Sequence, residues 1–411
     1  MSTYLPRFAD STLGRLVGAF PAVIVLGPRG CGKTTTARRM AAATVALDDP
    51  RQAAAFHLDP SAALAALRPA YGTLLIDEWQ EVPAVLGAVK RAVDTGAGPG
   101  SFVLTGSVHA ALEGASWAGT GRTVHVDMYP LTEAERQGRG DAVRPEELLF
   151  SEPASAPSGH DLTDYLVAAL VGGYPATFGL DDRDRQLWLR SFADQLVTRD
   201  AAEAEPIRDL TALRRLFRVL AEYSGAIVDD SEIARAVGID VRTVRGYQRV
   251  LTDLRVVDSL PAWHDSRISR LVKAPKRYLV DSGLAAALLG VDLFGVLRRG
   301  DIVGHLLETF VIAQLRSLFA TADGDWRLHH LRVQDGRHEI DVIAEAADGG
   351  VVAIEIKATA APAANDARHI AWLRATIGQR FRQGIVYHTG TLSMPLGERI
   401  TARPISTLWA A

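Results

Sequence analysis

The chain has 411 residues, of which 48% are hydrophobic and 23% charged, enough apolar material for two to four soluble globular domains. Its formal net charge of −3 excludes an overall basic field for nucleic acid or an anionic membrane, so any such site must be a local patch. The single cysteine, Cys31, excludes an internal disulfide and a cysteine-based zinc site. Neither a signal peptide nor an apolar run of about 18 residues is apparent, so we expect a cytoplasmic protein without a membrane span.

The first motif follows a short apolar run, residues 22–26, which is typical of a buried parallel strand. Residues 27–34 then read G-x-x-x-x-G-K-T, and a helix-compatible segment follows. Glycines let backbone N–H groups close around a phosphate, and the helix start adds its positive end. We expect Lys33 to reach the β- and γ-phosphates and Thr34 to bind Mg²⁺. The predicted nucleotide contacts are Gly27, Pro28, Arg29, Gly30, Cys31, Gly32, Lys33, Thr34 and Thr35. A chance glycine-rich turn is the alternative, and the strand–loop–helix context disfavours it.

A second apolar segment, residues 73–78, ends in Asp77 and Glu78. Acids at the carboxyl end of a parallel strand face the crevice where nucleotides bind. Asp77 is expected to hold the Mg²⁺ shell, and Glu78 to orient or deprotonate the attacking water. The alternative is two acids at an exposed strand end, which a P-loop upstream makes the weaker interpretation.

Three further candidate strands cover residues 44–48, 101–104 and 122–126. With the two strands above, their succession resembles the AAA-type branch of P-loop ATPases. The resemblance implies ATP hydrolysis, a sensor role for Thr105 or Ser107, and an Arg122 that contacts the γ-phosphate in cis or from a neighbouring subunit. A solvated strand-edge arginine is the alternative for Arg122. A homo-oligomer, and a role in trans for Arg122 or Arg199, are left open.

The middle of the chain contains a helix-turn-helix spacing. An amphipathic helix over residues 210–223 precedes a short helix capped by Ser231, and Asp240 is expected to cap a longer one over 241–254. Two strands after it would make a wing. From residue 207 to residue 280 there are 14 Lys and Arg against 9 Asp and Glu. This excess favours a winged helix with a basic helix against DNA, and the alternative is a module packed on the ATPase with solvated or paired arginines.

Carboxylates return in the last part of the chain, on two candidate strands over residues 337–344 and 351–357. Asp341 lies on the first strand. Glu355 and Lys357 lie two residues apart on the second and therefore on one face. A hairpin would bring Asp341 close to Glu355. Charges inside an otherwise apolar strand are costly without a reason, which favours a site over an ordinary exposed hairpin.

This Asp followed by Glu-x-Lys resembles the restriction-endonuclease-like fold, known as PD-(D/E)xK. The resemblance implies that Asp341 and Glu355 ligate Mg²⁺ through oxygen, with Glu308 of the preceding helix as an optional ligand. It also implies that Lys357 positions the attacking water or steadies the transition-state charge. The catalytic residues so predicted are Glu78, Asp341, Glu355 and Lys357, and the metal ligands are Thr34, Asp77, Glu308, Asp341 and Glu355.

Taken in order, the motifs resemble a family of prokaryotic proteins with an AAA-type ATPase domain and a nuclease-like C-terminal domain of unknown function. The other segments that carry this resemblance are 172–175, 199–200, 278–284 and 307–311. We therefore expect an α/β protein with four parts. These are an AAA-type parallel sheet (1–136), a linker with a helical segment (137–206), a winged helix (207–290) and a nuclease-like domain (291–411).

Two functions are consistent with this organisation. In the first, an ATPase is coupled to a metal-dependent nuclease-like domain that acts on DNA. In the second, the chain is a nucleotide-dependent switch or scaffold whose C-terminal domain binds nucleic acid or protein without cleaving. Both use ATP and Mg²⁺ as cofactors. The expected macromolecular partner is DNA, through the winged helix and the C-terminal domain.

Overall fold

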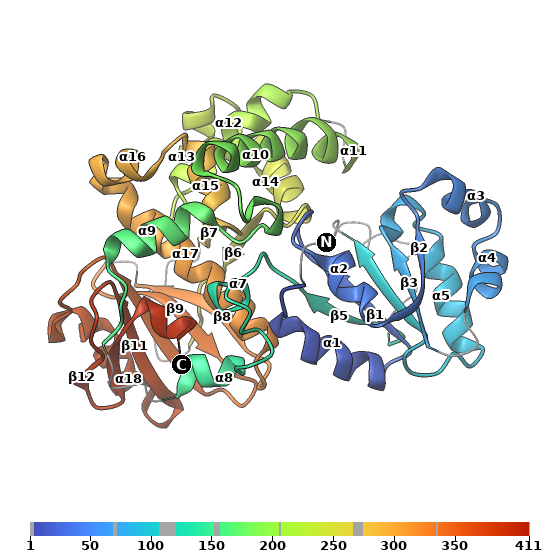
Figure 1. Cartoon of the computed structure of the whole chain (residues 1–411). Helices are drawn as coiled ribbons and strands as arrows, with labels where there is room; N and C mark the ends of the chain where they lie inside the picture. The colour runs from blue at the N-terminus through green and yellow to red at the C-terminus, as the bar shows by residue number, and fades with distance from the viewer. Residues whose placement is uncertain are drawn as a thin grey trace. The chain divides into compact units, whose positions relative to one another are not determined.

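The computed structural model describes residues 4–68, 72–106, 121–151, 157–204, 207–265, 274–333 and 336–410. The chain forms two compact units, coloured from blue to red along the chain in Figure 1. The first comprises Met1–Pro130 with Asp253–Arg255, and the second comprises Leu131–Thr252 with Val256–Ala411. Ser107, the alternative sensor residue, lies outside the described residues.

The first unit is built on a five-stranded parallel sheet, as its sequence predicts. The strand order is β2-β3-β4-β1-β5. The strands are β1 (Ala22–Leu26), β2 (Ala41–Ala46), β3 (Thr73–Asp77), β4 (Phe102–Gly106) and β5 (Val124–Asp127). Every residue of β1, β3 and β4 is buried, because both faces of the sheet are covered.

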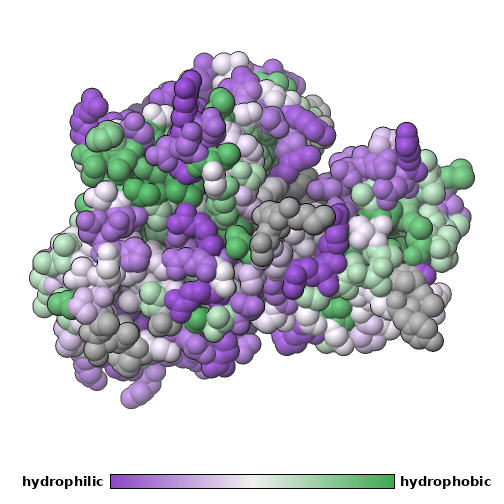
Figure 2. Space-filling model, viewed as in Figure 1, coloured by the Kyte–Doolittle hydropathy of each residue, from purple (hydrophilic) through white to green (hydrophobic). Residues whose placement is uncertain are grey.

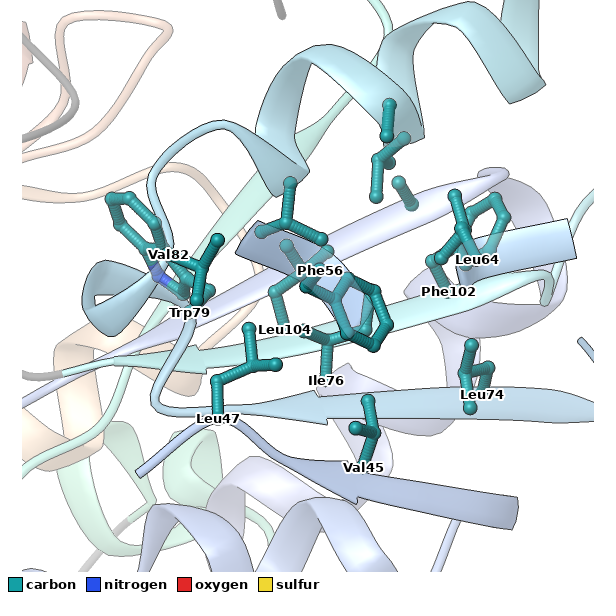
Figure 3. Packing of buried hydrophobic residues seen from close by; sticks show 14 of the residues in the cluster. Val45, Leu47, Phe56, Leu64, Leu74, Ile76, Trp79, Val82, Phe102 and Leu104 are labelled. Atoms are coloured by element: carbon teal, nitrogen blue, oxygen red, sulfur yellow. The ribbon is translucent and has the colours of Figure 1, made fainter. Parts of the chain in front are cut away.

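Helices on the two faces divide the core of this unit into two clusters. Helices α1 (Phe8–Ala19) and α2 (Lys33–Arg38) contribute to the first. The second is contributed by α3 (Pro50–Leu58), α4 (Pro60–Leu67), the short 3₁₀ turn η1 (Trp79–Glu81) and α5 (Val85–Asp94). Figure 3 shows this second cluster, in which Phe56, Leu64 and Trp79 pack over alternate residues of β3 and β4.

The helical part of the second unit precedes its large sheet in the chain. It consists of α7 (Glu133–Arg136), α8 (Pro145–Phe150), α9 (Leu162–Val171), α10 (Asp182–Gln195), a π-helical turn (Leu196–Asp200), α11 (Ala201–Ala204), α12 (Leu210–Glu222), α13 (Asp230–Val237), α14 (Val241–Asp253), α15 (Ser282–Leu289) and α16 (Leu293–Arg298). Figure 2 shows apolar side chains gathered over α16, where Phe294 and Leu297 are exposed.

The helix-turn-helix segment forms much as its spacing predicts. Asp240 caps α14 by accepting hydrogen bonds from the N–H and hydroxyl of Thr243. Ser231 is not the cap of α13, because that helix begins at Asp230 and its N-cap is Asp229, two residues before the predicted cap. The two following strands, β6 (Val257–Leu260) and β7 (Lys276–Leu279), pair antiparallel.

The C-terminal sheet has six strands in the order β12-β13-β11-β10-β9-β8. The strands are β8 (Arg327–Arg332), β9 (Glu339–Glu345), β10 (Val351–Lys357), β11 (Phe381–His388), β12 (Met394–Gly397) and β13 (Ile400–Pro404). Strands β8, β9 and β10 are antiparallel neighbours, whereas β10, β11 and β13 run parallel.

Two helices, α17 (Gly300–Thr321) and α18 (Arg368–Ile377), contact this sheet. Among the described helices, α17 is long and apolar enough to cross a membrane. However, 72% of its apolar stretch is buried inside the protein, which is typical of a core helix.

Candidate functional site

The P-loop connects β1 to α2 and has the backbone that phosphate binding requires. Gly30 and Gly32 have φ values of +75° and +102°, a left-handed conformation that side chains other than glycine rarely adopt. At Gly27 an added Cβ would collide with the carbonyl of Met128. Cys31 is buried against the same carbonyl, so it can offer a nucleotide only its backbone. Thr35 is exposed.

Lys33 is folded back over its own loop. Its Nζ donates to the carbonyl oxygen of Pro28 at 2.9 Å, and the residue is 4% exposed. A neutral carbonyl is a weaker partner for a buried ammonium group than a phosphate is, because a phosphate adds the attraction of an opposite charge to the hydrogen bond. The loop and its lysine therefore fit a nucleotide phosphate.

Three of the predicted residues meet at one carboxylate oxygen. The hydroxyl of Thr34 donates to Oδ1 of Asp77 at 2.7 Å, and the hydroxyl of Thr105 donates to the same oxygen. Strand pairing explains this, because Asp77 and Thr105 are partners in the β3–β4 register. Hydroxyl and carboxylate oxygens are suitable ligands for Mg²⁺ when nucleotide phosphates complete its coordination. The fit to Mg²⁺·ATP is therefore good.

Glu78 follows Asp77 with φ of 52°, the left-handed region that a non-glycine residue adopts only at some cost. Its carboxylate accepts a hydrogen bond from Nε2 of Gln80, which holds the side chain in place. Gly106 is required beside these residues, because a Cβ there would collide with the Trp79 indole. Sequence reasoning did not assign a role to Gln80, although its position two residues after the acid was a usable clue.

Arg7 is a second residue without a predicted role. It is 4% exposed, and its guanidinium donates to the carbonyl oxygens of Cys31 at 3.0 Å and Tyr129 at 2.7 Å. It therefore ties the P-loop to the segment after β5. No local motif marks Arg7, since its partners lie 24 and 122 residues away along the chain.

Arg122 does not lie at the P-loop. It precedes β5, and its Nε pairs with Asp94 at the end of α5, at 2.9 Å. Strands β5 and β1 are parallel, so the start of β5 lies beside the amino end of β1. The P-loop follows the carboxyl end of β1, at the other end of the strands. Strand polarity thus opposes the predicted contact in cis, and only a contact from a neighbouring subunit stays a prediction.

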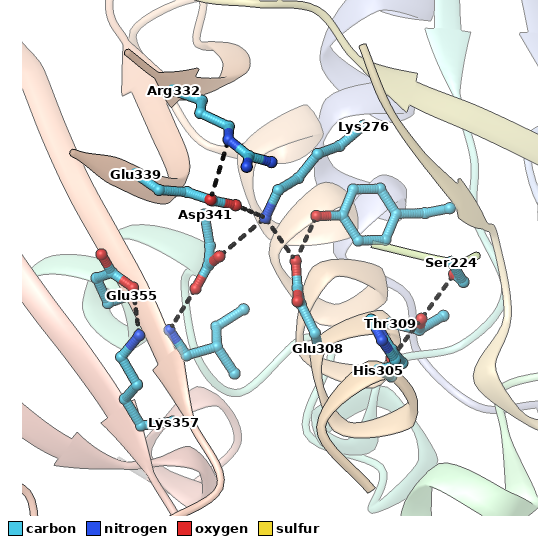
Figure 4. Close-up of polar contacts among 12 residues, drawn as sticks. Ser224, Lys276, His305, Glu308, Thr309, Arg332, Glu339, Asp341, Glu355 and Lys357 are labelled. Carbon is cyan, nitrogen blue, oxygen red and sulfur yellow. Dashed lines mark hydrogen bonds and ion pairs between the residues drawn. The ribbon is translucent and has the colours of Figure 1, made fainter. Parts of the chain in front are cut away.

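The C-terminal carboxylates also come together, but around a lysine. Asp341 of β9 accepts from the backbone N–H of Ile356 on β10, at 2.9 Å, and Glu355 accepts from Nζ of Lys357 at 2.8 Å. Lys276 of β7 lies between Asp341 and Glu308 of α17 (Figure 4). Its Nζ is 2.9 Å from Oδ1 of Asp341 and 3.1 Å from Oε1 of Glu308.

The buried charges of this cluster shift one another's pKa values. Burial lowers the pKa of Lys276, but the charges of Asp341 and Glu308 outweigh it and hold that pKa well above its ordinary value. Burial raises the pKa of Glu308 to about 7, against the opposing effect of Lys276. Burial also raises the pKa of Asp341, but the charges of Lys276 and Lys357 and the hydrogen bonds to Asp341 together outweigh burial, so its pKa is lowered. Burial and the adjoining Asp341 raise the pKa of Glu355 well above its ordinary value.

A divalent metal does not fit these side chains as they lie. Across the described residues, no group of three or more His, Cys, Asp or Glu side chains could hold a metal ion. The Lys276 ammonium already uses the oxygens that a metal between Glu308 and Asp341 would need. The metal role of Glu308, Asp341 and Glu355 therefore stays a prediction, and one that Lys276 opposes.

Comparison with known proteins agrees with the first of these sites. Residues 19–136 match the family described as AAA domain, which makes the N-terminal part a nucleotide-binding, ATPase-like domain. Residues 161–294 and 303–408 match two families described as domains of unknown function, DUF8612 and DUF4143.

Relatives along most of the chain are uncharacterized. One protein of Mycobacterium tuberculosis and one of Mycobacterium bovis are each 30% identical over 403 residues, 97% of this chain and 83% of theirs. A protein of Haemophilus influenzae is 23% identical over 59% of this chain and 56% of its own. A Walker-type ATPase structure from Pyrococcus abyssi covers 68% of this chain and 94% of its own at 13% identity, and its TM-score of 0.40 adds nothing to the fold described above.

Proposed function

From the premise that the chain belongs to the family of the two mycobacterial proteins, we propose that it is an ATP-hydrolysing, nucleotide-dependent switch. The observation that carries this proposal is the convergence of Thr34 and Thr105 on one oxygen of Asp77, beside the P-loop. Neutral hydroxyl partners leave the negative charge of Asp77 available to a cation. The proposed switch transmits the nucleotide state to the C-terminal part of the chain.

Each side chain at the P-loop has a definable task in this proposal. Bound Mg²⁺·ATP supplies the phosphoanhydride bond and the metal that balances its charge. Lys33 exchanges the Pro28 carbonyl for phosphate oxygens. Glu78, held by Gln80, orients the attacking water and accepts its proton at a carboxylate oxygen.

The test is ATP turnover by the full-length chain. Lys33→Ala is expected to abolish ATP binding or turnover, because no other side chain at the loop offers an ammonium group. Lys90→Ala is a matched control, since Lys90 is a partly exposed lysine that pairs with Asp94 of its own helix. Turnover at the wild-type rate by Lys33→Ala contradicts the proposal.

Trapping of the nucleotide tests Glu78 separately. We expect Glu78→Gln to retain ATP binding and to lose hydrolysis, because the amide keeps the shape of the carboxylate but cannot accept the proton. Retention of unhydrolysed ATP after gel filtration measures this directly. Wild-type release of ADP by Glu78→Gln would remove Glu78 from the mechanism.

DNA is the proposed partner of α14, which with α13 and the β6–β7 hairpin has the order of a winged helix. Arg242, Arg245 and Arg249 are exposed on this helix, and Arg245 is held by Asp230 at 2.8 Å. Arginine–phosphate contacts make DNA affinity depend on salt. We expect Arg242→Ala with Arg249→Ala to weaken binding of a labelled duplex and to reduce the salt slope by about two. Fluorescence anisotropy checks both quantities, and unchanged binding would exclude this face.

A second candidate function is nucleolytic, favoured by the contact between Asp341 and Glu355 beside Lys357. Incubation of plasmid and linear DNA with Mg²⁺ or Mn²⁺, with and without ATP, tests it. Cleavage by the wild type that is lost in Asp341→Ala and Lys357→Ala supports a nuclease. No cleavage under these conditions leaves the switch as the function.

A further inference from the structure

Strand β7 lies beside α17, and two of its side chains contact the carboxylate of Glu308. Lys276 and Tyr278 are two residues apart and therefore on one face of the strand. Lys276 Nζ and the Tyr278 hydroxyl both donate to Oε1 of Glu308, at 3.1 and 2.6 Å. The backbone also approaches Glu308 closely at Gly225, where an added Cβ would lie 3.1 Å from the Glu308 carboxyl carbon. Glu308 is thus enclosed by two side chains of β7 and by the backbone at Gly225.

The hairpin is held in this position by contacts that do not involve Glu308 or Asp341. The backbone N–H of Gly225 donates to the carbonyl oxygen of Arg277 at 2.8 Å. Arg277 also pairs with Asp230 of α13 at 2.6 Å. At the far end, Nε2 of His330 on β8 is 2.9 Å from the carbonyl oxygen of Ala274. Lys276 is therefore placed by its strand, and it is not a mobile surface lysine.

The Lys276 ammonium stands where a cation shared by the acidic side chains would stand. It lies 2.9 Å from Asp341, 3.1 Å from Glu308 and 3.5 Å from Glu339, and its side chain is 2% exposed. Mg²⁺ and Ca²⁺ bind carboxylate oxygens at roughly 2.0–2.6 Å. An ammonium group at hydrogen-bonding distance therefore fills this space and satisfies the same oxygens (Figure 4).

We propose that Lys276 is an internal cation that closes the C-terminal carboxylate cluster to divalent metals. In this arrangement Glu308 and Asp341 bind the lysine in place of a metal ion. Removal of its charge, or withdrawal of the hairpin that carries it, opens a site for a hard divalent cation such as Mg²⁺ or Mn²⁺. This inference is independent of ATP hydrolysis. It also means that a nuclease with its metal at this cluster would work only after Lys276 has left the carboxylates.

Charge supplies the reason that removal of the lysine should create a metal site. Taking one partner from a buried ion pair leaves the other charges uncompensated. Without Lys276, the oxygens of Asp341 and Glu308 would face each other inside the protein. A divalent cation relieves that repulsion, with Asp341 and Glu308 as its protein ligands and water in its other coordination positions.

Mn²⁺ binding by the full-length, nucleotide-free chain tests the proposal, with free Mn²⁺ followed by electron paramagnetic resonance. The variants are Lys276→Gln, which keeps a hydrogen-bonding side chain, and Lys276→Met, which keeps only its length. We expect both to bind one additional Mn²⁺ at least about tenfold more tightly than the wild type, since a like charge no longer repels the ion. Adding Asp341→Asn should abolish the gain, which assigns it to this cluster.

Lys357→Met is the matched control. Lys357 also pairs with a buried carboxylate, at 2.8 Å, but its loss leaves Lys276 in place, so no additional Mn²⁺ is expected. The proposal is overturned if folded Lys276→Gln gains no Mn²⁺, which would make Lys276 an ordinary structural ion pair. It is equally overturned if the wild type already binds Mn²⁺ with that affinity and loses it in Asp341→Asn.

If Lys276→Gln and Lys276→Met do not fold, a second measurement still tests whether Lys276 excludes a metal. If neither lysine variant folds alone, the proposal requires that Mn²⁺ restore folding, because a metal ion that binds only the folded state stabilises that state. Circular dichroism with and without Mn²⁺ measures this, and failure of Mn²⁺ to rescue folding counts against the proposal. None of these measurements uses ATP, so failure of the ATPase proposal would be seen separately, in the turnover of Lys33→Ala.

Discussion

The two acidic sites of this protein differ in what holds their aspartate. Asp77 accepts hydrogen bonds from the neutral hydroxyls of Thr34 and Thr105, whereas Asp341 is bound by the ammonium of Lys276. Both residues lie on largely buried strands and both are less than 10% exposed. The difference shows that an acidic motif specifies a negative charge, and that the partner decides whether this charge remains available to a metal.

The largest effect should follow from removing the charge of Asp341. Asp341→Asn leaves Lys276 buried without its closest carboxylate, and breaking a buried pair costs about 3–5 kcal/mol of unfolding free energy. Urea denaturation measures this loss. Asp348→Asn is the control, because Asp348 pairs with Arg382 in an exposed turn and should have no measurable effect. A stability of Asp341→Asn close to that of the wild type would contradict the central role of the ion pair.

Asp77 should show the opposite pattern, a large loss of activity with little loss of stability. Asp77→Asn keeps an oxygen for the two hydroxyls but removes the charge that holds the metal shell. We expect ATP turnover to fall by about 100- to 1,000-fold, the usual cost of losing one preorganised electrostatic contact. Steady-state turnover and urea denaturation of the same sample check both parts. An Asp77→Asn variant that is as active as the wild type would contradict the view that the charge of Asp77 holds the metal.

Asp281 sharpens the comparison because its carboxylate accepts from backbone N–H groups rather than from hydroxyls or a lysine. The N–H groups of Gly173 and Leu284 donate at 2.6 and 2.7 Å, and burial raises the pKa of Asp281 from 3.8 to about 6. The folded state therefore binds a proton that the unfolded state releases between about pH 4 and pH 6. The free energy of unfolding should fall by about 3 kcal/mol as pH rises through that window, and level off above it.

The measurement for Asp281 is urea denaturation at several pH values. Asp281→Asn should lose this part of the pH dependence, because the amide does not titrate. It should also lose a constant amount of stability, since only one of its two terminal atoms can accept a hydrogen bond from the backbone. An identical pH profile for the variant and the wild type would show that Asp281 does not titrate in this range.

The smallest expected effect concerns the orientation of Glu78. Gln80→Leu removes the hydrogen bond to the Glu78 carboxylate without changing the residue that acts on water. We expect kcat to fall by about tenfold, with little change in the ATP concentration at half-maximal rate, because general-base catalysis contributes about 10²–10⁴-fold and orientation is part of it. A larger rise in KM than fall in kcat would place Gln80 in nucleotide binding instead.

Local sequence was sufficient for the P-loop and for the strands around it. Residues 27–34 are contiguous, so their spacing alone specifies the loop, and the apolar runs specify buried parallel strands. The boundaries were less certain, because neighbouring strands decide where pairing begins. β2, for example, begins at Ala41, three residues before its predicted start at residue 44.

Distant contacts account for what sequence reasoning missed. For Arg122 the resemblance implies a γ-phosphate contact in cis or from a neighbouring subunit, and the polarity of β5 opposes only the contact in cis. Arg7 reaches the P-loop from outside any motif. In neither case could spacing along the chain reveal the partner.

By itself, the sequence determined that this protein has a phosphate-binding loop, an acidic strand end beside it, and a carboxylate pair on two later strands. It could do so because each feature depends on neighbouring residues and on the period of a strand. Only the tertiary structure decided that Thr34 and Thr105 share Asp77, and that Lys276 reaches Asp341 from 65 residues away. The physical reason is that burial and charge compensation depend on which strands pack together, and packing brings together residues whose separation in the chain carries no pattern.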